Sequence, residues 1–433
     1  MSAFDKVIGY KTIKDELLQI CDMFHNREVY EKLGAKLPQG VILYGDPGLG
    51  KTLMAESFIE ESGLETYTIR RNKGNDDFVG EITDTFRKAK ENAPCIVFLD
   101  DMDKFSNEDN YYRDTEEYVA VQSGIDVVED FDVFVLATAN DIDKLPASLL
   151  RPGRFDKRIR VNTPTGQDTR EIVEYYLSDK EVAQDVNIDD LVNMMSYNSC
   201  AELETILNEA AVCAASQRKH AIGMKDIVKA VLRMEYDAPD KNVRVDDRDL
   251  ARIALHEAGH VVVAETICPE SVGLATVRSN GRDRSGGFLH MCKELTTIDE
   301  NVMVSLAGKV AVELYFSGGA ASGCSSDLMH AMKLVRDGMG INATCGLGML
   351  SIGDTRYDIS GNFLDRSEAV AYSELERFMF ITRNILIKNR DFLEIVRDEL
   401  IEKETLLSSD INRIEESLSE KVILFGEDAV KWW

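Results

Sequence analysis

The chain has 433 residues, more than a single domain usually holds, so we expect more than one hydrophobic core. Hydrophobic residues make up 44% and charged residues 29%, with only 8 prolines, which is typical of a folded protein and excludes a disordered one. The 50 Lys and Arg against 77 Asp and Glu give a formal charge of -27. This charge disfavours nucleic acids and anionic membrane surfaces as partners, but a local positive site can still bind a nucleotide.

The sequence also indicates where the protein works. No stretch approaches the roughly 18 uninterrupted apolar residues of a membrane-spanning helix, and residues 1–14 have no signal-peptide layout. The 8 cysteines are scattered without any CxxC pair, as in reduced intracellular proteins. We therefore expect a cytoplasmic protein.

The first part of the chain alternates strands with helices. Short runs rich in Val, Ile and Phe at 41–44, 95–99 and 133–137 enclose helical patterns such as 82–92. This alternation predicts an α/β domain over residues 1–164, with a parallel sheet and helices on both faces. The following block, 165–240, has helical periodicity. A linker is expected at 236–244, across the boundary with the last block.

The last block, 241–433, is mainly helical. One uninterrupted helix is expected from 247 to 266, followed by a β-hairpin over 272–277 and 287–291. From 298 onward the pattern is again mostly helical. The chain therefore divides into an α/β block, a small helical block and a mixed, mainly α-helical block.

A strand–turn–helix pattern near the N-terminus predicts a phosphate-binding loop. The sequence fits GxxxxGK[ST] between the apolar run 41–44 and the helix-forming run 53–61. Glycines let backbone N–H groups surround phosphate oxygens, and the positive end of the following helix adds to the attraction. We expect ATP here, with the lysine on the β- and γ-phosphates and the threonine on Mg²⁺. The loop consists of Gly45, Asp46, Pro47, Gly48, Leu49, Gly50, Lys51 and Thr52.

Polar residues at the ends of two later strands predict the rest of the nucleotide site. Asp100 and Asp101 follow the strand 95–99, where a carboxylate can coordinate Mg²⁺ beside the phosphate loop. Asn140 follows the next strand, and its amide could orient an attacking water, although such an asparagine taken alone is more often a turn residue.

Residues from about 4 to 232 resemble an AAA+ ATPase module. Arg151 and Arg154 flank a Pro-Gly turn, and guanidinium groups stabilise the charge that spreads over transferring phosphoryl oxygens. With the loop and the strand ends, these residues match the Walker A, Walker B, sensor and arginine-finger motifs. The resemblance implies a homo-hexameric ring with ATP between subunits, both arginines reaching into the adjacent site, and a helical lid.

One position departs from the AAA+ pattern. The family usually carries Asp-Glu where this chain carries Asp100-Asp101. Asp101 is then the base that activates water, one methylene shorter than glutamate. An aspartate can act as a general base within hydrogen-bond distance, so we expect slower hydrolysis or a small shift of the nucleotide.

The sequence His256-Glu257-Ala258-Gly259-His260 is an HExxH motif. On a helix, His256 and His260 lie on one face and can both bind Zn²⁺, while Glu257 points towards a zinc-activated water. A hydrolytic site needs a third protein ligand and an open position. Spacing alone leaves Asp327, His330, His290 and several other carboxylates as candidates.

Residues from about 247 to 411 resemble the peptidase domain of FtsH-type proteases. The match rests on the HExxH motif and on the segments 306–309, 323–328, 346–348 and 402–406. In that family the third zinc ligand is the Asp of a Ser/Asn-Asp-Leu segment, which implies Asp327 here. Together the two resemblances cover nearly the whole chain in the family's order.

Three further features follow from this resemblance. Residues 78–80 resemble the aromatic pore loop that grips unfolded substrate, although Phe78 could instead belong to the core. Residues 287–291 resemble the edge strand along which substrate lies, or are simply a hairpin over the metal helix. FtsH proteins begin with membrane-spanning helices, whereas this chain begins near the ATPase module; if that start is native, membrane-protein substrates are less expected.

We therefore predict an ATP-dependent zinc metalloprotease that threads unfolded or tagged proteins through a ring and hydrolyses them with a zinc-activated water. Its cofactors are Zn²⁺, ATP and Mg²⁺, and Glu257 is the general base. Two alternatives stay open. One is an AAA+ unfoldase or remodelling ATPase with a purely structural metal site, and the other is a zinc peptidase whose ATPase half has lost hydrolysis through Asp101.

Overall fold

The computed structural model describes residues 2–71, 77–106, 115–238, 247–279, 281, 286–316, 324–340 and 361–418. It forms two compact units, residues 1–179 with 197–205 and residues 180–196 with 206–433. The boundary between them crosses helix α8 (Cys200–Ser216). Each unit contains a hydrophobic core of its own.

The first unit is built on a parallel sheet with the strand order β2-β3-β4-β1-β5. Its strands are β1 (Gly40–Tyr44), β2 (Glu65–Arg70), β3 (Cys95–Asp100), β4 (Val133–Ala139) and β5 (Lys157–Arg160). The central strands β3 and β4 are buried along their whole length. This confirms the predicted parallel α/β architecture and the three strands expected from apolar runs.

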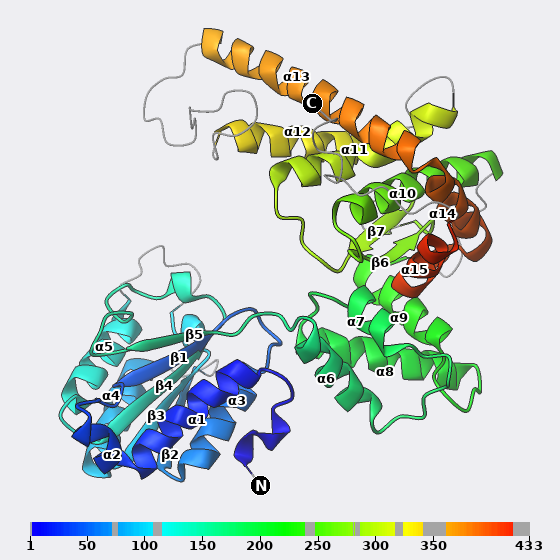
Figure 1. Ribbon diagram of the computed structural model, residues 1–433. Coiled ribbons are helices and arrows are strands. Elements are labelled where there is room, and N and C mark those ends of the chain that lie inside the picture. The colour runs from blue at the N-terminus through cyan, green and yellow to red at the C-terminus, as the bar shows by residue number, and fades with distance from the viewer. Residues whose placement is uncertain are drawn as a thin grey trace. The chain divides into compact units, whose positions relative to one another are not determined.

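Helices cover both faces of this sheet. Figure 1 shows α1 and α3 on one face and α4 and α5 on the other. The α4 and α5 side packs Ile82, Phe86, Val121 and Ile125 against the strands. The helices of this unit are α1 (Lys11–His25), α2 (Arg27–Lys32), α3 (Lys51–Ser62), α4 (Phe78–Glu91), α5 (Glu116–Val128) and α6 (Gln167–Leu177).

The second unit is mainly helical and surrounds a small antiparallel sheet of order β7-β6-β8. Its strands are β6 (Val272–Thr276), β7 (Phe288–Met291) and β8 (Thr405–Leu407). Its remaining helices are α7 (Ile188–Met194), α9 (Met224–Tyr236), α10 (Asp247–Ile267), α11 (Ile298–Tyr315), α12 (Ser325–Gly340), α13 (Gly361–Lys388), α14 (Arg390–Lys403) and α15 (Ser408–Ser417). The long helix, the hairpin and the mainly helical character expected here are confirmed.

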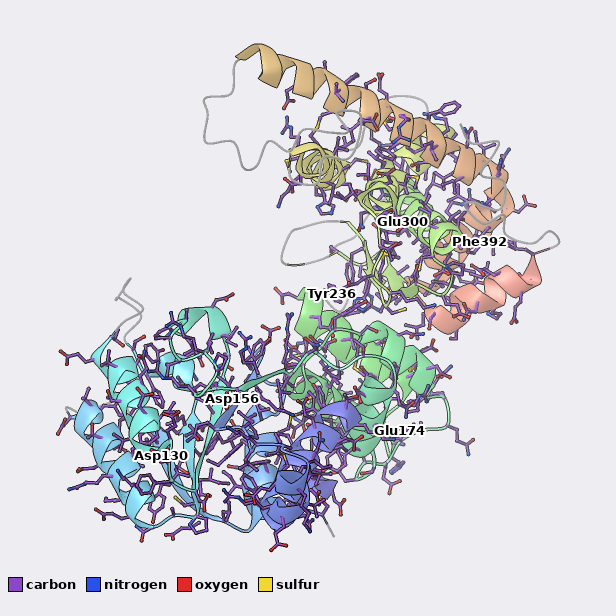
Figure 2. All side chains as sticks on the ribbon, turned by 60° about the vertical axis from the view of Figure 1, so that its left-hand side comes forward. Asp130, Asp156, Glu174, Tyr236, Glu300 and Phe392 are labelled. Carbon is purple, nitrogen blue, oxygen red and sulfur yellow. The ribbon has the colours of Figure 1, made fainter. Side chains whose placement is uncertain are left out.

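Helix α10 is the centre of this unit because it is buried on several sides. It packs against α11, α14 and the small sheet, as Figure 1 shows. Its residues 261–264, Val-Val-Val-Ala, are all fully buried, and Phe392 of α14, labelled in Figure 2, is 1% exposed in the same core. A helix held from several sides can fix the side chains it presents to a site.

Candidate functional site

The phosphate-loop residues form one continuous turn between β1 and α3. Gly48 and Gly50 have φ angles of +82° and +81°, a region that suits glycine. A Cβ on Gly45 would lie 2.0 Å from the Val161 carbonyl oxygen, so a larger residue has no room there. The loop therefore has the backbone conformation that its glycines predict, and α3 begins at Lys51 directly after it.

Lys51 is folded onto the loop and touches the neighbouring strand. Its buried ammonium donates to the carbonyl oxygens of Gly45 at 2.8 Å and Asp46 at 2.7 Å, and to Asn140 Oδ1 at 2.8 Å. Burial lowers the pKa of Lys51, while nearby carboxylates led by Asp101 oppose this shift. The structure thus brings together the loop lysine and the amide expected to orient water.

Asp100 lies beside Thr52 at the carboxyl end of β3. Its Oδ1 accepts hydrogen bonds from Thr52 Oγ1 at 3.2 Å and Thr138 Oγ1 at 2.8 Å, and its Oδ2 pairs with Arg70 at 2.9 Å. A threonine hydroxyl beside a carboxylate is the ligand pair that Mg²⁺ uses next to a phosphate loop. Arg70 was not predicted, because it ends a strand whose polar sequence gave no strand signal.

Asp101 follows in a left-handed backbone conformation with a φ of +53°. Its carboxylate pairs with Lys104 at 2.7 Å, and its N–H donates to Thr138 Oγ1 at 2.9 Å. Both expected carboxylates therefore lie at the same edge of the sheet, and the second is paired with Lys104.

The two candidate arginines differ in their surroundings. Arg154 forms a two-pronged ion pair with Asp126 of α5, at 3.0 Å and 2.9 Å, and also donates to the Ser148 carbonyl. Arg151 is exposed, and the part of the chain that the structure describes offers it no ion pair. Arg151 is thus the more available of the two for another molecule.

The HExxH histidines and Asp327 come together into one cluster of possible metal ligands. His256 and His260 lie one turn apart on α10, with their Nε2 atoms 3.1 Å from each other. Asp327 of α12 places its Oδ2 at 3.0 Å from His256 Nε2 and 3.6 Å from His260 Nε2. Ligands about 2.0–2.1 Å from a tetrahedral zinc are about 3.3 Å apart, so these distances fit such an ion.

The groups around the cluster also favour a cation. The other ring nitrogen of His260 donates to the Val304 carbonyl at 2.7 Å, which leaves its Nε2 facing the cluster. Asp327 Oδ2 is buried, and the contacts described for it are to the two histidine rings of the cluster. Burial opposes a charge on His256, but Asp327 and then Cys324 outweigh it and raise the pKa of His256 to about 10. The residues present fit a bound zinc ion.

Glu257 lies next to the strand that borders the cluster. It is 4% exposed, and a Cβ on Gly287 would lie 2.6 Å from its Oε1. Gly287 directly precedes β7, which is an edge strand of the small sheet. The expected general base therefore adjoins the ligand His256 in the chain and lies against the residue that precedes an edge strand, to which an extended peptide could add.

Several contacts around this site were not predicted from the sequence. A Cβ on Gly308 would lie 2.4 Å from the His256 ring, so α11 approaches the metal helix closely only because of that glycine. Glu265, near the end of α10, is buried and accepts the N–H groups of Glu270, Ser271 and Val272 that lead into β6. Burial raises the pKa of Glu265 to about 7, against the effect of these N–H groups.

The structure separates the other candidates from these sites. His330 is exposed on α12 and outside the ligand cluster, and His290 bonds to Tyr236 instead. The structure supports the alternative that Phe78 belongs to the core, since it is 4% exposed and packs edge-on against Phe105 at 5.0 Å. The segment 346–348, used in the resemblance, lies outside the described residues.

The fold and the two clusters define a P-loop nucleotide-binding domain joined to a HExxH-type peptidase domain. Residues 41–163 match the ATPase family associated with various cellular activities (AAA), and residues 243–414 match peptidase family M41. Among the described helices, none has the length and apolar character needed to cross a membrane.

Curated relatives agree with both matches. The chain is 31% identical over 425 residues to the ATP-dependent zinc metalloprotease FtsH 2 of Sphaerobacter thermophilus, covering 93% of this chain and 64% of the relative. It is 30% identical to FtsH 2 of Symbiobacterium thermophilum, covering 95% and 74% of the two chains, and 30% identical to FtsH of Leptotrichia buccalis, covering 98% and 58%. The chain belongs to the FtsH family of ATP-dependent zinc metalloproteases. It spans between 58% and 74% of the length of these relatives.

Proposed function

We propose that this chain is an ATP-dependent zinc metalloendopeptidase that hydrolyses unfolded polypeptides. The observation that carries the proposal is the meeting of His256, His260 and Asp327 beside the buried Glu257 and the edge strand β7. The nucleotide site in the first unit supports ATP as the source of energy for unfolding.

Each residue of the peptidase site has a role in this proposal. His256, His260 and Asp327 would hold Zn²⁺, which supplies Lewis-acid activation of water when bound. Glu257 accepts the proton of the attacking water and returns it to the leaving amine. Strand β7 binds the substrate by adding an extended peptide to its edge, a mode that tolerates many sequences.

The ATPase roles follow from the geometry of the loop. Residues 45–52 would hold the phosphates, and Thr52 and Asp100 would hold Mg²⁺. Asp101 acts as the base for hydrolysis once it leaves Lys104, with Asn140 orienting the water. In a hexameric ring Arg151 reaches the neighbouring subunit's nucleotide, and Arg154 supports that turn through Asp126.

The alternative with a structural metal is disfavoured by the ligand number. Within the described residues, three protein ligands meet at the cluster, whereas a structural zinc is normally closed by four. A remodelling ATPase would hydrolyse ATP without cleaving casein, and a chelator would change nothing in its activity.

The direct test is Glu257→Gln in the full chain. We expect peptide and casein cleavage to fall at least about 100-fold because the proton acceptor is gone, with ATPase rate and zinc content unchanged. Asp249→Asn, an exposed change on the same helix, is the matched control and retains activity. Lys51→Ala should lose ATPase activity, which Glu257→Gln keeps, and should lose casein cleavage as well. Full cleavage by Glu257→Gln would refute the proposed base.

A further inference from the structure

Helices α7 and α9, which precede the peptidase domain in the chain, contact the strand that borders the metal site. Tyr236, the last residue of α9 and labelled in Figure 2, stacks on Phe288 of β7 with ring centroids 4.1 Å apart. Its hydroxyl lies 2.8 Å from His290 Nδ1 on the same strand. Phe288 and His290 are two residues apart, so both side chains lie on one face of β7.

The hydrogen bond between Tyr236 and His290 joins a hydroxyl to a ring nitrogen whose role depends on the tautomer of the imidazole. Burial lowers the pKa of His290 to about 4, so its imidazole is neutral near pH 7 and can accept the phenolic proton. A partly buried hydroxyl bonded to a neutral ring is a short-range contact that does not depend on salt, unlike a surface ion pair. The contact therefore fixes a position and supplies no charge to the site.

A second contact holds α7 on the same domain. Asp190 of α7 is 3% exposed and accepts three hydrogen bonds from the start of α15. The donors are Ser408 Oγ at 2.8 Å, Ser409 N at 2.8 Å and Ser409 Oγ at 2.6 Å. A Cβ on Gly273 of β6 would lie 2.4 Å from the Asn193 carbonyl oxygen, so α7 also rests directly on the sheet backbone.

The residue of β7 that Tyr236 contacts is next in the chain to the glycine that lies against Glu257, the proposed catalytic base. Tyr236 holds β7 at Phe288, and the preceding residue, Gly287, lies against Glu257. A strand end that shifts by a few tenths of an ångström would move both the substrate edge and the wall beside Glu257. In the described sheet β7 is hydrogen-bonded to one strand, β6. Tyr236 contacts β7 through a side chain on the face of the strand.

We propose that Tyr236 is a positioning residue that fixes β7 for the binding of an extended peptide, while Asp190 holds α7 against the same domain. The inference rests on the proposed function, because it assigns β7 as the substrate edge. In this proposal the helices before the peptidase domain affect how substrate binds to β7, and they do not affect the hydrolysis of the bound peptide.

The test separates binding from chemistry with Tyr236→Phe in the full chain. This variant keeps the stack on Phe288 and removes the hydroxyl. With a short fluorogenic peptide that needs no unfolding, we expect KM to rise roughly three- to tenfold, the effect of one lost hydrogen bond. The values of kcat and zinc content stay as in the parent protein. Tyr236→Ala, which also loses the stack, raises KM further.

The control is Tyr175→Phe, which alters a 53% exposed tyrosine and leaves KM unchanged. An unchanged KM in Tyr236→Phe, or a fall in kcat at constant KM, would overturn the inference. Backbone hydrogen exchange gives a second readout that does not need activity: residues 288–291 should exchange faster in Tyr236→Phe, while α10 does not change. Equal exchange would also overturn the inference, whereas a parent protein that cleaves nothing would contradict the proposed function alone.

Discussion

Glycines set how closely the elements around the metal cluster approach one another. Gly308 of α11 leaves room for the His256 ring, and Gly259 of α10 lets the Ala307 carbonyl oxygen approach to 2.7 Å from where a Cβ would be. Gly287 has the same effect on the other side, where it faces Glu257 and the Thr276 carbonyl oxygen. The positions of the His256 imidazole and the Glu257 carboxylate therefore depend on neighbouring residues that have no side chain.

Gly287→Ala should lower peptidase activity without removing the metal. The added Cβ would lie 2.6 Å from Glu257 Oε1 and 2.8 Å from the Thr276 carbonyl, closer than atoms pack, so Glu257 or β7 must move. We expect kcat/KM to fall about 10- to 100-fold, equivalent to about 1.4–2.8 kcal/mol of transition-state stabilisation. The measurement is steady-state peptide cleavage alongside zinc content by elemental analysis.

The matched control is Gly223→Ala, because a Cβ there meets its nearest atom at an ordinary 3.4 Å. It should leave both cleavage and zinc content unaltered. Parent-like cleavage by Gly287→Ala would mean that Glu257 does not need the space that this glycine provides.

At the scale of elements, the sequence predicted what is buried and missed what lies at an edge. Strands β1, β3 and β4 have continuous apolar runs because they lie inside the sheet. Strands β2 and β5 are the two edges, and their sequences ETYTIR and KRIR each contain a single buried residue. A polar edge strand has no hydrophobic pattern, so only the neighbouring strands define it.

The peptidase site shows the same division between local and distant information. His256 and His260 are one helical turn apart, so their spacing is sufficient to predict that they share a face, with Glu257 next to the first of them. The choice of the third ligand depends on how α12 packs against α10, which no spacing within one helix contains. Asp327 and His330 are three residues apart on α12, and only the fold places the first in the cluster.

Phe78→Ala should weaken the fold of the first unit and not selectively remove substrate gripping. Phe78 is the first residue of α4 and is 4% exposed, and its ring contacts Phe105 and the Arg71 guanidinium. Removing a buried phenylalanine typically costs about 3–5 kcal/mol. The check is the midpoint of urea unfolding followed by circular dichroism, with ATPase rate measured on the protein that remains folded.

Phe131→Ala is the comparison, since that ring is 42% exposed in the same unit, and its loss should cost well under half as much. A Phe78→Ala protein with unchanged stability that still hydrolyses ATP, but no longer degrades folded substrates, would support the pore-loop interpretation instead.

At the scale of the whole molecule, the two units have separate cores and separate ligand sites. The phosphate loop, Thr52 and Asp100 lie entirely within the first unit, and the histidines and Asp327 lie entirely within the second. A ligand that binds only the folded state stabilises the unit that holds it, by about 2.7 kcal/mol at 100 times its dissociation constant. Each ligand should therefore act on its own part of the chain.

Calorimetric melting should show this as two transitions with different ligand responses. After chelation, adding Zn²⁺ should raise the melting temperature of one transition by roughly 5–10 °C, and Mg²⁺-ATP should raise the other. Asp327→Ala should abolish only the first response and Lys51→Ala only the second, because each variant removes a ligand contact from one unit. A single transition that both ligands raise equally would contradict two units that unfold separately, and would instead mean that the sheet and the metal cluster are stabilised as one cooperative block.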